Sequence, residues 1–236
     1  ERITEALADL VYTVPDYRHT LPALEITQVF VDIPLAPMTL YKYFEKTYTF
    51  NIDGHIEQSA DNAAVLSGKL QQMASGAIYL DDELGFRVGV AEIHDEKIGA
   101  CKQLVQELDG KPVILTYWYK HELERLERAF PDAINLNDDG AIDQWNAGKV
   151  PVLLVQPLSC SHGLQLQFGG CNMIMLTPIW SNDITEQMIA RIWRTGQTEP
   201  VHIQEIIARG TIDEMVIDRI DGKKNFAHLF AALTDL

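Results

Sequence analysis

Two arginines in the last third of the chain have the types and spacing to act on a phosphate group. Arg191 and Arg194 are three residues apart, and Gln187 precedes Arg191 by one helical turn. On a helix all three side chains would share one face. Two planar guanidinium groups on one face suit a triphosphate, whose terminal phosphoryl group must be stabilised as it departs. The spacing alone equally fits a solvated helix with two surface arginines, so both interpretations stay open at this point.

The elements that must position these side chains follow a regular rhythm from His94 onward. Helical patterns there alternate with short apolar runs, which are Val113–Leu115, Val152–Val155, Met173–Leu176 and Val201–Ile207. A helix from Asp183 to Thr195 would carry both arginines. Apolar runs separated by helices indicate a mostly parallel sheet covered on both faces, so the predicted fold class is α/β.

The first part of the chain has a different pattern. We expect a strand from Leu24 to Ile33, helices from Met38 to Phe50 and from Ala60 to Met73, and a hairpin between Ala77 and Ile93. The sequence therefore predicts a mainly helical N-terminal extension over residues 1–95 and an α/β domain over residues 96–236.

Composition limits the functions that the chain can have. It contains 47% hydrophobic and 22% charged residues, and no apolar run is long enough to span a membrane. The formal net charge of −15 argues against strong nucleic-acid binding by this chain alone, because phosphate neutralisation needs clustered Lys and Arg. The cysteines Cys101, Cys160 and Cys171 form no CxxC pair, which favours buried thiols in a reducing cytoplasm and predicts no metal site.

The segment around the two arginines resembles the last motif of SWI/SNF-type, superfamily-two ATPases. That motif reads Gln, three residues, Arg, two residues, Arg, one residue, Gly-Gln, and Gln187–Gln197 matches every fixed position. Five more segments resemble motifs of this family in the family's order: Lys69–Tyr79, Lys111–Tyr117, Ser161–Gln167, Pro178–Asn182 and Gly210–Glu214. The chain is thereby similar to the C-terminal RecA-like lobe of these enzymes, and especially to that of the short phage and bacterial members.

The resemblance implies a RecA-like three-layer fold and a set of residue roles. Arg191 and Arg194 would be catalytic arginine fingers, and Gln187 and Gly163 would join them in contacting ATP. The residues that would contact the DNA backbone are Thr116, Ser161, His162, Gly163 and Gln165. ATP and Mg²⁺ would be held mainly by a first RecA-like lobe N-terminal to Glu1, because this sequence has no GxxxxGK[ST] phosphate loop.

The implied function is that of the second motor lobe of an ATP-dependent translocase or remodeller acting on double-stranded DNA. The lobe would be inactive alone, would have no membrane partner, and would work in the cytoplasm of a prokaryotic or phage-infected cell. Two alternatives stay open. The first is a non-catalytic RecA-like interaction module, and the second is a lobe of a strand-separating helicase.

Several positions depart from the family pattern or need a separate interpretation. Gln165 stands where the family has Asn, and Asn137–Trp145 resembles a shortened form of the family's Asp-Gly-…-Phe-Asn stretch. Trp180 and Trp193 are expected in core or interlobe packing. Arg125 is expected on a helix remote from the motifs, where its replacement would change turnover little.

Overall fold

The computed structural model describes residues 20–52, 56–82 and 84–219. The helix expected around Ile3 to Val11, and most of the connector from Asp16 to Pro22, lie outside these residues. Within the described ranges, no helix combines the length and the apolar character needed to cross a bilayer.

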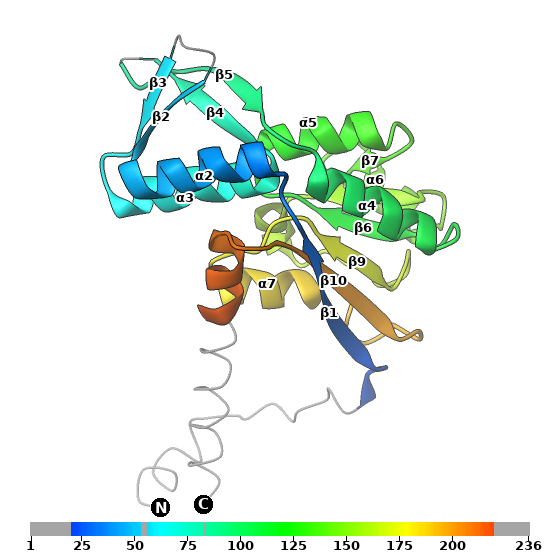
Figure 1. The fold of residues 1–236 in the computed structure, drawn as a ribbon. Coiled ribbons are helices and arrows are strands. Elements are labelled where there is room, and N and C mark those ends of the chain that lie inside the picture. Colours follow the sequence, from blue (N-terminus) through cyan, green and yellow to red (C-terminus); the bar gives the residue numbers. More distant parts are fainter. Residues whose placement is uncertain (1–19, 53–55, 83, 220–236) are drawn as a thin grey trace, which may run out of the picture.

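A six-stranded sheet with the order β1-β10-β9-β6-β8-β7 forms the centre of the molecule (Figure 1). Its strands are β1 (Leu24–Val31), β6 (Val113–Thr116), β7 (Ile134–Asn135), β8 (Val152–Val155), β9 (Asn172–Met175) and β10 (Val201–Ala208). Every pairing in this sheet is parallel. The predicted RecA-like α/β fold class is confirmed.

Helices cover both faces of this sheet. They are α4 (Glu96–Glu107), α5 (Lys120–Ala129), α6 (Ala141–Asn146) and α7 (Asn182–Ile189). One core joins α4 and α5 to Val113 and Leu115 of β6, and another joins α6 and α7 to Ile114 between them. Figure 1 shows α4 and α7 on opposite sides of the sheet. Because successive strand residues point to opposite faces, a strand covered on both sides is apolar throughout, as predicted.

The N-terminal part combines helices with two antiparallel hairpins. It contains α2 (Leu35–Thr47), β2 (Thr49–Ile52), β3 (Ile56–Ser59), α3 (Ala63–Ser75), β4 (Ala77–Asp81) and β5 (Arg87–Glu92). The predicted hairpin between Ala77 and Ile93 is confirmed as the β4–β5 pair. A third core joins α2 and α3 to Ile212 and Val216 in a helix over residues 212–219.

Strand β1 belongs to the central sheet although it lies in the N-terminal part of the chain. It pairs in parallel with β10 from Leu24 opposite Val201 to Val31 opposite Ala208. The expected strand is therefore present, but it pairs with a strand on the other side of the division predicted at residue 95. The pattern of β1 could not reveal this pairing, since its partner strand lies near the other end of the sequence. The boundary itself stays a prediction.

Candidate functional site

The motif segments meet at the carboxyl edge of the central sheet, where ligands of open α/β sheets bind. Strand β6 ends at Thr116, and β8 is followed by a 3₁₀ helix, η2 (Pro157–His162), that leads to Gly163. Strand β9 is followed by the Pro178–Asn182 motif and by α7. Helices α7 and η2 contact each other, so motifs distant in sequence form one surface.

Two segments of this edge are joined by hydrogen bonds: the glycine loop (residues 163–170) and the arginine segment (residues 190–197). The Leu166 amide donates to the Arg191 carbonyl at 3.1 Å. Arg194 Nη1 donates to the Leu164 carbonyl at 3.4 Å. The position of the arginines therefore depends on the conformation of the glycine loop.

The arginine segment is not helical, so the prediction that both arginines share one helix face is wrong. Helix α7 begins after Ser181, whose hydroxyl accepts from the Ile184 amide, and it ends at Ile189. Tight turns follow, and Gly196 adopts a left-handed φ of 101°. The physical reason is the glycine loop, because the Arg191 carbonyl accepts from Leu166 and does not continue a helical ladder.

The side chains of the arginine segment keep part of their donor capacity open. Arg191 is half-buried; its Nε is buried and has no acceptor, and its two terminal nitrogens donate to no other described residue. Arg194 is also half-buried and makes the single long bond to Leu164. Gln187 is exposed on α7, two residues before the helix ends. A guanidinium with open donors can bind an anion without first breaking a bond within the fold.

The other predicted site residues differ in accessibility. Gly163 is exposed and has a φ of 71°, a left-handed conformation that favours glycine. Gln165 is exposed on the same loop. Thr116 is 1% exposed, which does not favour its predicted contact with DNA. The side chains of Ser161 and His162 lie outside the described residues.

A buried carboxylate that the sequence analysis missed fixes the ends of β6 and β9. Glu122 of α5 is fully buried, and one of its oxygens accepts from the Trp118 amide at 2.6 Å and the Tyr119 amide at 3.0 Å. Its other oxygen accepts from Thr177 Oγ1 at 2.5 Å. Glu122 therefore accepts hydrogen bonds from the turn after β6 and from the segment that follows β9. Glu122 accepts from the N-cap amide of α5, but the N-cap is Tyr119 and not the Ser or Thr of a capping box, so no sequence signal indicates this role.

A buried ion pair that the sequence analysis also missed links the end of β9 to the Gly210–Glu214 motif. Lys97 Nζ lies 2.6 Å from Asp213 Oδ2, and both side chains are fully buried. Lys97 also donates to the Leu176 carbonyl at 3.0 Å, while Asp213 accepts from the Ala208 amide. The pair therefore ties α4, β9 and β10 to the start of the helix over residues 212–219. A buried charge is tolerated here because each partner has further hydrogen bonds.

The thiols and the two tryptophans behave as packing residues. Burial raises the pKa of the Cys101 thiol to about 12 and also raises that of Cys171. Trp180 and Trp193 are half-buried against the cores, and Trp193 Nε1 donates to the Pro22 carbonyl at 2.8 Å. Among the described residues, no group of three or more His, Cys, Asp or Glu could hold a metal ion.

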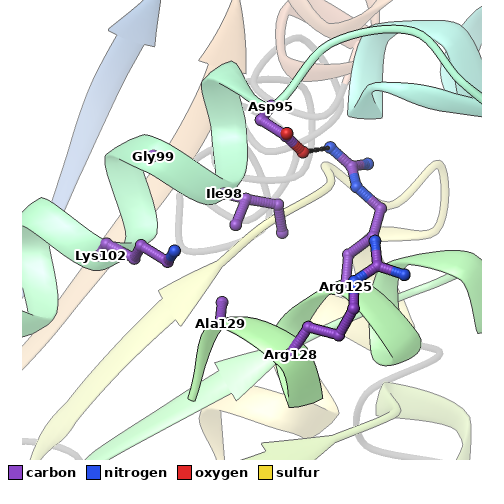
Figure 2. Close-up of a pocket in the computed structure, with 7 residues that line it drawn as sticks. All are labelled: Asp95, Ile98, Gly99, Lys102, Arg125, Arg128 and Ala129. Carbon is purple, nitrogen blue, oxygen red and sulfur yellow. Dashed lines mark hydrogen bonds and ion pairs between the residues drawn. The ribbon is translucent and has the colours of Figure 1, made fainter.

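A separate cavity of about 200 Å³ lies between α4 and α5 (Figure 2). Arg125 lines it, but its guanidinium is bonded to the Ser75 carbonyl, the His94 carbonyl and Asp95. With 2% exposure Arg125 is a structural residue and therefore an unsuitable control, while the small expected effect of its replacement on turnover stays a prediction. Arg128, which forms an exposed ion pair with Glu92, is the better control.

Comparisons with known proteins agree with this arrangement. No protein-family model matches the chain. The C-terminal part of the Fun30 ATPase domain has the same fold, with a TM-score of 0.63 at 15% identity over 85% of this chain and 90% of that one. A RAD54-like DNA repair and recombination protein of Drosophila ananassae is 33% identical over 36% of this chain. The chain fits the C-terminal lobe of a SWI/SNF-type ATPase.

Other relatives of this SWI/SNF-type lobe are viral. Putative protein p41 of Acyrthosiphon pisum secondary endosymbiont phage 1 is 39% identical over 82% of this chain. Putative helicase 172L of Invertebrate iridescent virus 6 is 37% identical over 28% of this chain. The chain spans 42% of the length of the phage protein and 11% of the RAD54-like protein. It therefore corresponds to one part of these longer proteins.

Proposed function

We propose that the chain is the second motor lobe of an ATP-dependent translocase or remodeller of double-stranded DNA. A first RecA-like lobe would hold ATP and Mg²⁺ against the carboxyl edge of this lobe. The observation that carries the proposal is the arginine segment, which is joined to the glycine loop through the Arg194 guanidinium and the main-chain carbonyl of Arg191, and in which both guanidinium groups are half-buried. Bound Mg²⁺ would neutralise phosphate charge in the first lobe.

Arg191 and Arg194 are proposed to act as arginine fingers. Charge builds on the transferred phosphoryl oxygens in the transition state, and a planar fork of fixed donors stabilises that charge without rearrangement. Gln187, exposed one turn earlier, would contact the same nucleotide. The exposed backbone around Gly163, together with Gln165, would contact the DNA backbone.

The acidic composition is compatible with this proposal. Main-chain amides and hydroxyl groups contact phosphates in many protein–DNA interfaces, and they add no net charge. With a formal charge of −15, the lobe alone should bind duplex DNA weakly at physiological salt. It should also lack ATPase activity alone, because its sequence has no phosphate loop.

The test is DNA-stimulated ATP hydrolysis by the two-lobed protein. Changing Arg191 or Arg194 to Ala should lower turnover by about 10³-fold, the scale of an arginine finger. Arg→Lys should restore little, because an ammonium group cannot reproduce the planar fork. The matched control is Arg128→Ala, which should leave turnover near normal. If both Ala variants kept normal turnover, the arginine-finger role would be excluded.

A further inference from the structure

Two adjacent side chains at the end of α6 hold two successive carbonyls of the glycine loop. Trp145 Nε1 donates to the Leu166 carbonyl at 2.8 Å, and Asn146 Nδ2 donates to the Gln165 carbonyl at 2.8 Å. The indole is fully buried, whereas Asn146 is half-buried, with its Oδ1 buried and without a partner among the described residues. Adjacent donors that bind adjacent carbonyls fix both the position and the direction of the peptide between them.

The same stretch of backbone, residues 164–166, also forms hydrogen bonds with the arginine segment. Leu166 accepts from Trp145 through its carbonyl and donates through its amide to Arg191. The neighbouring Leu164 carbonyl accepts from Arg194. A continuous path of hydrogen bonds therefore runs from the end of α6, through residues 164–166, to both arginines.

Two glycines allow the indole to lie under the loop. A Cβ at Gly169 would overlap the Trp145 ring, and one at Gly170 would lie 3.1 Å from it. The ring is thus enclosed by the loop that it supports, and it has little space to move. A support of this kind restricts the loop before any ligand binds.

We propose that Trp145 and Asn146 are positioning residues that fix Arg191 and Arg194 for phosphoryl transfer. This inference rests on the proposed arginine-finger role. Stabilisation of a transition state requires donors that are already in place, and a shift of about 1 Å can cost on the order of 10²-fold in rate. Neither side chain contacts the nucleotide in this scheme, since both act through the backbone of the glycine loop.

The experiment is ATP hydrolysis by the two-lobed protein carrying Trp145→Phe or Asn146→Ala. Trp145→Phe keeps a ring under the loop but removes the N–H donor, and Asn146→Ala changes a half-buried residue. Each should lower kcat about tenfold, the scale of one lost hydrogen bond, with KM for ATP nearly unchanged. Gln103→Ala is the matched control, because Gln103 Nε2 donates to Glu107 within α4, on the opposite face of the sheet from the arginine segment.

A double-mutant cycle separates positioning from general destabilisation. In the Arg191→Ala/Arg194→Ala background, Trp145→Phe should cause no further loss of single-turnover rate. A full additional tenfold loss there, or an equal loss of kcat in Gln103→Ala, would overturn the positioning role. Normal kcat in both α6 variants would also overturn it, provided that the arginine variants are impaired. Normal turnover in the arginine variants would instead exclude the proposed function.

Discussion

Arginines have different roles in two regions of the lobe. Their terminal hydrogen-bond donors are satisfied within the fold in one region and are open in the other. Beside the cavity of Figure 2, Arg125 donates to two backbone carbonyls and to Asp95. At the carboxyl edge of the sheet, Arg194 makes one bond of 3.4 Å. Within the described part of the chain, the Arg191 guanidinium has no hydrogen-bond acceptor. An arginine with its terminal donors satisfied stabilises the fold, whereas one with open donors is available to a ligand.

The largest expected effect on stability is at Arg125. Arg125→Ala would leave the buried carbonyls of Ser75 and His94 without their donor, so the free energy of unfolding should fall by about 3 to 5 kcal/mol. Chemical denaturation measures this change in the free energy of unfolding. A loss below about 1 kcal/mol would mean that the bonds of Arg125 contribute little, and the contrast with the arginine segment would fail.

The next effect is expected on the opposite side of the sheet, at Gly169. A Cβ there would overlap the Trp145 indole, so Gly169→Ala should lower the free energy of unfolding by about 3 kcal/mol. Gly99→Ala is the matched control, because Gly99 lies in α4 with open space around its Cβ position. That change should stabilise α4 by up to about 1 kcal/mol. Equal effects of the two substitutions would show that the indole is not enclosed.

Acid should weaken the region around Arg125. Burial, together with a smaller contribution from the nearby Arg125 charge, lowers the pKa of His94 to about 4 and that of His121 to about 3. Both histidines are neutral when folded but protonated when unfolded below their ordinary pKa. The two neutral histidines therefore contribute fully to the free energy of unfolding above about pH 6.5, and this contribution is lost as the pH falls towards 4.

Between pH 6 and pH 5 the two histidines should together remove about 2 kcal/mol from the free energy of unfolding. Denaturation curves at several pH values measure this loss. In His121→Phe the pH dependence should be about half as steep. An unchanged slope in that variant would show that His121 does not contribute.

The smallest effect on stability is expected at Arg191, the residue with the largest proposed effect on turnover. Arg191→Ala removes no hydrogen bond donated by that guanidinium within the described residues, so its free energy of unfolding should change by less than about 1 kcal/mol. Arg128→Ala, at an exposed ion pair, should give a similar small change. If Arg191→Ala were as destabilising as Arg125→Ala, Arg191 would be a structural residue too.

The sequence revealed those parts of the fold that depend on local patterns. The strands β6, β8 and β9 were predictable because burial on both faces requires consecutive apolar residues. The position of β1 was not, because its pattern does not specify a partner. Helix α7 was predicted too long, since the apolar spacing through Ile189 and Ile192 continues while the backbone turns towards Leu166.

The candidate site was only partly predictable for the same reason. Its motifs identified Arg191, Arg194 and the glycine loop, and the structure joins them by hydrogen bonds. The support from Trp145 depends on a side chain donating to a backbone carbonyl 21 residues away. Any residue can offer that carbonyl, so no residue type indicates it.

The parallel pairing of β1 with β10 has a consequence for synthesis of the protein. Thr27 donates to the Ile203 carbonyl, and these residues are 176 positions apart in the sequence. At translation rates of about 5 to 20 residues per second, β1 leaves the ribosome roughly 9 to 35 s before its partner exists. During that interval β1, which carries Ile26, Val29 and Phe30, has unpaired backbone groups that other chains can bind. The central sheet therefore cannot be completed until β10 has been made.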